Sequence, residues 1–193
     1  NYLPFINAYE TMVSILMITL KEEGEFLSKP QKEINEKEEH NKRIKDIIKI
    51  MKILNNPSAY NIKYATILSS KSIMAKFNYV IPLLSAEIKN ENQNNTVMEG
   101  NEFINSELPY KERLEILERI VGIYNNLLFY YLGGIEDYSP LFETLLDFLS
   151  LSQEKKLTLT TNFLEHALLF FNNFYWRANE FSVKFLNSTL IKL

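Results

Sequence analysis

Seven apolar residues near the end of the chain recur at the spacing of one helix face. They follow one another at steps of four, three, four, four, three and four residues: Phe163, Ala167, Phe170, Phe174, Ala178, Phe181 and Phe185. Because an α-helix completes one turn in about 3.6 residues, side chains at these steps share one face. A second line of apolar residues widens that face: Leu164, Leu168, Phe171 and Tyr175. The pattern predicts a long helix that is surrounded by neighbouring helices.

The same stretch holds the single tryptophan of the chain, which supports a second interpretation. Trp176 and Leu169 lie on a third side of the predicted helix, and Tyr175 and Arg177 flank the tryptophan. Aromatic and arginine side chains are frequent anchors of protein interfaces. We therefore expect the face that begins at Phe163 to form core, and we take Trp176, Arg177 and Tyr175 as candidate interface residues.

Glycine and proline are scarce, which favours long helices in the rest of the chain. The 193 residues include 5 glycines and 6 prolines, and strand-like alternation does not extend beyond a few residues. Helical spacing recurs in six segments, at about residues 4–28, 30–54, 57–88, 109–132, 139–152 and 153–190. The sequence predicts an all-α protein, a five- to six-helix bundle that forms a single helical domain over residues 1–193.

Prolines and polar runs mark where the predicted helices end or bend. Residues 55–61, which include Pro57, are predicted to form a turn, and Pro82 is predicted to kink a helix rather than end it. Residues 90–108 are polar, rich in asparagine and without helical period, so we expect a flexible loop between two helical halves. The chain begins at Asn1 rather than at methionine, which suggests processing or a fragment of a longer protein.

Composition and charge exclude several classes of function. The chain has no cysteine, so disulfides, thiol catalysis and thiolate metal sites are excluded. The formal net charge is −3, and the lysines between residues 30 and 45 alternate with glutamates, so no basic surface for nucleic acid is expected. The uncharged runs at 11–20 and 120–135 are shorter than the roughly 20 residues that span a bilayer. We expect no nucleic-acid partner and no membrane span.

The two histidines do not fit a metal or catalytic pattern. His40 lies in the charged start of a predicted helix, where we expect it to be solvated. His166 follows Glu165, but adjacent helical residues point about 100° apart. The Glu-x-x-His spacing of di-iron bundles is absent at both histidines. Glycine-rich phosphate loops and a Gly-x-Ser-x-Gly motif are also absent from the sequence, so we expect no enzyme activity, no cofactor and no metal site.

These observations favour a non-enzymatic helical protein–protein interaction module: a subunit, an adaptor or a scaffold piece. Its expected partner is another protein or a second copy of the chain. The alternative is a secreted or surface-displayed helical domain of a parasite or pathogen that binds a host ligand. Asn94 and Asn187 fit the Asn-x-Ser/Thr acceptor pattern for glycosylation, which matters only on a secretory route. The sequence carries no motif set of a known family and predicts neither the partner's identity nor the compartment.

Overall fold

A computed structural model of the chain describes residues 3–29, 34–96 and 110–178. These residues form seven α-helices and one short 3₁₀ helix, and they contain no strand. In chain order the elements are α1 (Leu3–Leu27), α2 (Ile34–Tyr60), α3 (Ile62–Leu68), α4 (Lys71–Thr96), α5 (Lys111–Phe129), η1 (Ile135–Tyr138), α6 (Ser139–Gln153) and α7 (Thr161–Ala178). The predicted all-α fold is confirmed.

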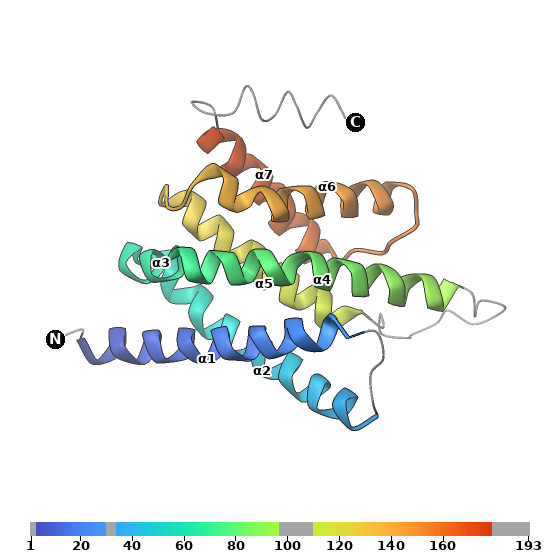
Figure 1. Cartoon of the computed structure of the whole chain (residues 1–193). Helices are drawn as coiled ribbons and strands as arrows, with labels where there is room; N and C mark the ends of the chain where they lie inside the picture. Colours follow the sequence, from blue (N-terminus) through green and yellow to red (C-terminus); the bar gives the residue numbers. More distant parts are fainter. Residues whose placement is uncertain (1–2, 30–33, 97–109, 179–193) are drawn as a thin grey trace.

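The helices are arranged in two layers (Figure 1). Helices α1, α4 and α6 run side by side in one layer, and α2, α5 and α7 cross behind them. Helix α5 is the centre of the second layer, because it packs against α2 on one side and α7 on the other and also contacts α3 and α4. Within the described part of the chain, helix α7 therefore forms an edge of its layer, with α5 on one side only.

The sequence of α5 explains its central position. Its charged residues are concentrated in the first half, and the second half is uncharged from Ile120 onward. Twelve of its 19 residues are buried. Apolar side chains on nearly all sides are expected of a helix enclosed by neighbours. The uncharged part of α5 is buried from Ile120 to Leu128 except for the partly exposed Asn126, and the last residue of the helix, Phe129, is exposed. None of the helices in the described ranges is long and apolar enough to cross a membrane.

The segment around Pro57 differs from its prediction. Helix α2 continues through Pro57 to Tyr60, so residues 55–60 are helical and the predicted turn is wrong. The chain breaks instead at Asn61, whose side chain caps α3 by accepting a hydrogen bond from the Lys63 amide at 2.9 Å, and again at residues 69–70. Helix α4 continues past Pro82, as predicted. The predicted helix over residues 57–88 is therefore divided among the end of α2, α3 and α4.

Contacts from distant residues hold the last turn of α2 in helical form. The side-chain amide of Asn126 on α5 donates to Asn55 Oδ1 at 2.8 Å and to Ser58 Oγ at 2.9 Å. The Tyr9 hydroxyl on α1 donates to the Leu54 carbonyl at 2.8 Å. Because proline lacks an amide hydrogen, it weakens a helix locally, and these bonds supply partners for the polar groups around it. Proline spacing alone does not reveal such partners.

Helix α4 also extends into the segment that the sequence predicts to be a loop. Residues 90–96 are helical, so the prediction of a loop is wrong for these residues, and the rest of the predicted loop, residues 97–108, lies outside the described residues. Two tertiary contacts explain the extension. Glu91 forms an ion pair with Arg113 of α5, with Nη1 and Oε2 2.9 Å apart, and the Asn92 side chain donates to the Lys156 carbonyl. Polar residues thus stay helical because their side chains bind neighbouring elements.

A carboxylate on α5 joins this helix to α2. Glu115 Oε1 lies 2.8 Å from Lys52 Nζ and 3.2 Å from Arg119 Nη2. Burial by itself would raise the pKa of Glu115, but the hydrogen bonds and charges of Lys52 and Arg119 outweigh burial and lower the pKa. A glutamate whose pKa is lower in the folded protein than in the unfolded protein stabilises the fold when it is ionised. That contribution is complete above about pH 4.3 and is lost as the pH falls through the lower, folded pKa.

We expect Glu115→Gln to reduce the free energy of unfolding at pH 7 by about 1 kcal/mol or less, since the ion pairs are partly exposed to solvent. The loss should shrink as the pH falls to about 3, because the wild-type carboxylate then becomes protonated and its advantage disappears. Urea unfolding at both pH values measures the two differences. An equal loss at pH 7 and at pH 3 would show that the ion pairs are not its cause.

Candidate interaction surface

The inner face of α7 is part of the core. Four of its residues are buried: Phe163, Ala167, Phe170 and Phe174. Two rings of α6 pack against them, Phe148 with its centroid 6.0 Å from that of Phe163 and Phe142 with its centroid 4.8 Å from that of Phe174. The prediction that this aromatic face forms core is confirmed over residues 163–174. The side chain of Ala178, as well as Phe181 and Phe185, lies outside the described part of the chain.

The opposite face of α7 is apolar and exposed to solvent. Trp176 and Leu168 are each 63% exposed, Tyr175 is 54% exposed and Leu169 is 47% exposed. The expectation that neighbours surround this helix is therefore wrong. Its position at the edge of a layer is the reason, because α5 and α6 cover only the face that carries the phenylalanines. We call Leu168, Leu169, Tyr175 and Trp176 the outer α7 surface.

The outer α7 surface consists of two parallel rows. Residues seven apart lie nearly above one another on a helix, so the rows pair Leu168 with Tyr175 and Leu169 with Trp176. The two aromatic rings meet edge to face, with centroids 6.2 Å apart. Between the rows lie two exposed polar residues, Glu165 and Asn172. Two of the three predicted interface residues, Tyr175 and Trp176, thus lie together on an exposed face.

The third predicted interface residue, Arg177, connects α7 to the turn after α5. Its Nη2 donates to the Gly133 carbonyl at 2.7 Å, and its guanidinium carbon lies 5.3 Å from the ring centroid of Tyr131. Tyr131 is itself exposed and extends the aromatic surface beyond α7. Helical spacing assigns Tyr131 to the apolar stripe of the predicted helix over residues 109–132, but α5 ends at Phe129, and the proximity of Tyr131 to Arg177 depends on the turn at Gly133, where φ is +75°. Glycine adopts this left-handed conformation without steric cost.

A second group of apolar side chains is exposed on α1. Its members are Phe5, Ile15 and Ile18, whereas the core-facing side of α1 carries Tyr9, Val13, Leu16 and Leu20. The α1 group contains neither tryptophan nor arginine, while Trp176 and Arg177 stand at one end of the outer α7 surface. Tryptophan, tyrosine and arginine are the residues most often found at the energetic centres of interfaces. We therefore take the outer α7 surface as the candidate site.

His40 is buried, so the expectation that it is solvated is wrong. Its side chain is 3% exposed, and its ring stacks on Phe26 of α1 with centroids 4.2 Å apart. His40 Nδ1 lies 3.0 Å from Glu23 Oε2, and His40 Nε2 lies 2.9 Å from Arg113 Nη2. Because a guanidinium group only donates, Nε2 accepts and Nδ1 carries the hydrogen that Glu23 receives. The charged start of α2 buries this histidine because α1 and α5 supply its partners.

The polar network around His40 joins four helices. Arg43 Nε on α2 lies 3.4 Å from the same Glu23 oxygen, and Arg113 on α5 binds Glu91 of α4. Each arginine thus faces a carboxylate, which balances the charge of a mostly buried cluster. A mostly buried polar cluster of this kind fixes the relative positions of α1, α2, α4 and α5.

The other histidine and the acidic residues do not assemble into a metal site. His166 Nδ1 is 3.4 Å from Glu118 Oε1, and the side chain of His166 is partly exposed. Over the ranges 3–29, 34–96 and 110–178, no group of three or more histidine, aspartate or glutamate side chains is placed to hold a metal ion. This arrangement places a histidine of α7 beside a carboxylate of α5 and supplies no set of metal ligands among the described residues.

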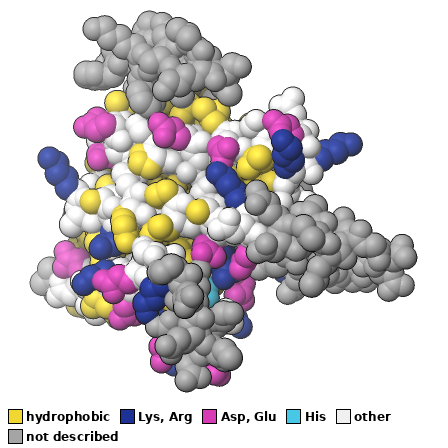
Figure 2. All heavy atoms as spheres, turned by 45° about the vertical axis from the view of Figure 1, so that its right-hand side comes forward, with side chains coloured by type: hydrophobic (Ala, Val, Ile, Leu, Met, Phe, Trp, Pro, Cys, Tyr) yellow, Lys and Arg dark blue, Asp and Glu magenta, His cyan; other side chains and the backbone are white. Residues whose placement is uncertain are grey.

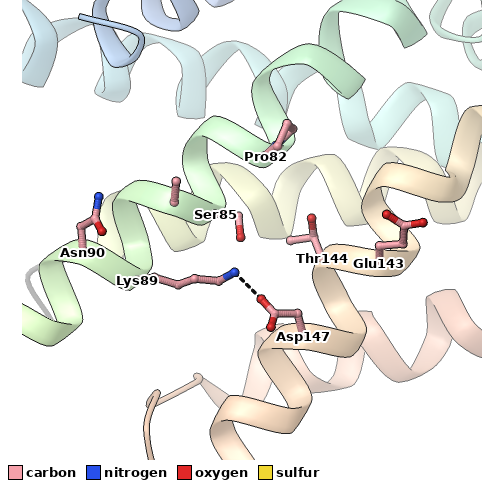
Figure 3. A pocket seen from close by; sticks show the side chains of 8 residues that line it. Pro82, Ser85, Lys89, Asn90, Glu143, Thr144 and Asp147 are labelled. Carbon is pink, nitrogen blue, oxygen red and sulfur yellow. Dashed lines mark ion pairs between the residues drawn. The ribbon is translucent and has the colours of Figure 1, made fainter. Parts of the chain in front are cut away.

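A groove of about 460 Å³ runs between α4 and α6 (Figure 3). Lys89 and Asp147 form an ion pair across it, with Ser85 and Thr144 on its walls. An activated hydroxyl nucleophile requires a base within hydrogen-bonding distance. The Lys89 ammonium group binds Asp147 instead, so the groove does not have the geometry of a serine–lysine pair.

On the face shown in Figure 2, acidic and basic side chains are interspersed around exposed hydrophobic side chains.

Comparisons with known proteins add no functional information about this chain. A scan against protein-family models found no matching family, and searches of curated proteins and of solved structures found no similar protein. The functional proposal therefore depends on the residues and contacts described above.

Proposed function

We propose that this protein is a non-enzymatic helical interaction module, used as a subunit, adaptor or scaffold piece, that binds another protein or a second copy of itself through the outer α7 surface. The observation that supports the proposal is the pair of apolar rows, ending in the exposed Trp176, on an edge helix. Removal of apolar surface from water contributes about 25 cal/mol per Å². Tryptophan and tyrosine bury large areas, so a partner that covers these rows gains affinity from few residues.

The rigid attachment of α7 also supports this proposal. The Asn125 side chain of α5 donates to the His166 carbonyl at 3.1 Å, and Asn173 donates to Asn125 Oδ1 at 3.3 Å. At the end of α7, the Arg177 side chain donates a hydrogen bond to the Gly133 carbonyl. Together with the buried phenylalanines, these bonds fix the direction of the outer rows before any partner binds. A preorganised surface loses less conformational entropy on association.

A photo-reactive amino acid at position 168 is expected to cross-link to a protein partner. The matched control is the same amino acid at position 18 on α1, since Ile18 is 61% exposed and Leu168 is 63% exposed. Each variant of the full chain is irradiated in the cells that express it, and the products are identified by mass spectrometry. We expect products that contain a second polypeptide from position 168 and few from position 18.

Two results would contradict the proposal. Efficient cross-linking from position 18 with none from position 168 would move the interaction surface to α1. Cross-links from position 168 only within one molecule, with no second polypeptide attached, would show that the outer α7 surface is covered internally. Both positions are exposed, so we expect both variants to keep the native fold. Circular dichroism spectra and melting temperatures that match those of the wild-type protein check this.

A further inference from the structure

We infer that the partner at the outer α7 surface is a second copy of this chain, bound with its α7 antiparallel to the first about a twofold axis next to Asn172. This inference rests on the proposed function of that surface. A twofold interface uses the same patch on both subunits, so the patch must be complementary to itself. The two rows of α7 meet this condition in their spacing, their polar centre and their charges.

The spacing of the rows is symmetric about Asn172. The midpoint between Leu168 and Tyr175 and the midpoint between Leu169 and Trp176 both fall beside this residue. A twofold rotation about an axis perpendicular to the helix reverses its direction but leaves each row on its own side. Leu168 then faces Tyr175 of the second copy, and Leu169 faces Trp176 of the second copy. Each leucine thus meets an aromatic ring, and the larger side chains do not collide.

The polar residues of the surface fit the same arrangement. Asn172 lies at the axis opposite its own copy, and a side-chain amide both donates and accepts hydrogen bonds, so two of them pair. A single asparagine in a helix–helix seam fixes the register of the helices. Glu165 lies between the rows near one end of the surface, so antiparallel helices keep its two copies about 21 Å apart and avoid repulsion between like charges. Parallel helices would place Glu165 beside Glu165.

The size of the surface indicates a reversible dimer. A standard interface buries about 800 Å² on each partner. Four side chains on one helix provide less than this, and Tyr131 beside Arg177 extends the surface at one end. An interface at the small end of this range dissociates on dilution. We therefore expect a dimer at high protein concentration and a monomer, with the chain mass of 22.7 kDa, at low concentration.

Cysteine substitution tests the axis directly, because the chain has no cysteine of its own. Asn172→Cys is expected to form a disulfide-linked dimer under mild oxidation, since the two sulfurs meet at the axis. Glu165→Cys is the matched control on the same exposed face. Its two copies would lie about 21 Å apart in the antiparallel pair, far beyond the reach of a disulfide. Leu168→Glu added to Asn172→Cys should reduce the linked fraction at least about tenfold, because it places a charge in the seam.

Each outcome supports or overturns the inference. Linkage at position 172 alone, lost with Leu168→Glu, supports it. Linkage at both positions 172 and 165 indicates parallel helices and overturns it. A chain that is monomeric at all concentrations, with linkage at neither position, also overturns it. If position 168 then still captures a different protein by photo-cross-linking, the proposed function stands while this inference falls. If position 168 gives only cross-links within one molecule, with no product heavier than the 22.7 kDa chain, both fall.

Discussion

Replacement of Phe170 or Phe174 by alanine is expected to lower the free energy of unfolding by about 3–5 kcal/mol. Both rings are buried, and their centroids are 5.8 Å apart. Truncation removes the transfer free energy of the ring and leaves a cavity that the surrounding helices fill only in part. Because a domain is stabilised by only about 5–15 kcal/mol, either substitution should bring the protein close to unfolding at room temperature.

The control for this prediction lies on the same helix. Trp176→Ala removes a larger side chain, yet we expect it to change the unfolding free energy by no more than about 0.5 kcal/mol, because Trp176 is exposed. Urea denaturation of the three variants beside the wild-type protein, at concentrations low enough to avoid association, measures all three effects. Wild-type stability of both phenylalanine variants would show that the inner face of α7 is not core.

His40→Ala is expected to lower the free energy of unfolding by about 1.5–4.5 kcal/mol, the sum of two effects. The substitution removes the hydrogen bond to the buried Glu23 carboxylate, where leaving a charged group unsatisfied costs about 1–3 kcal/mol. It also removes the stacking on Phe26, for which aromatic pairs contribute about 0.5–1.5 kcal/mol. Glu23 Oε1 already has no hydrogen-bond partner among the described residues, so Arg43 alone would remain near this carboxylate.

The second histidine supplies the matched control. His166→Ala changes a partly exposed side chain near Glu118, and we expect a loss of about 1 kcal/mol or less. The comparison is made by equilibrium unfolding at pH 7 for both variants. Losses of the same small size would mean that the His40 network contributes little to the positions of α1 and α5 and that His40 is solvated in solution.

Sequence periodicity predicts the helices well because it depends on local spacing. The phenylalanines of α7 and the apolar second half of α5 show the inward-facing residues directly, since each helix buries the side that its apolar residues share. The environment of His40 depends instead on Glu23 and Arg113, which are distant in sequence. A charged segment normally indicates a solvated helix face, and only tertiary packing shows that this histidine is enclosed.

Helix boundaries and the exposure of α7 were also beyond sequence reasoning, for a related reason. Pro57 and the asparagines after Asn90 have low intrinsic helix propensity. The helix nevertheless continues through both segments, because Asn126 hydrogen-bonds to Ser58 and the Lys156 carbonyl accepts a hydrogen bond from Asn92. An apolar residue such as Trp176 is equally compatible with packing inside its own chain and with packing against another protein. Only the position of α7 at the edge of its layer distinguishes the two, which is why the sequence left both interpretations of this stretch open.

Acrylamide quenching of tryptophan fluorescence tests the central claim most directly, because Trp176 is the only tryptophan in the chain. The claim is that the outer α7 surface is open in the isolated protein and is covered on binding. We expect Trp176 in the dilute wild-type protein to be quenched nearly as efficiently as a free indole, and we expect quenching to fall when the surface associates with its partner. Strong protection of Trp176 in the dilute, monomeric chain would contradict the claim, because the outer α7 surface would then already be buried.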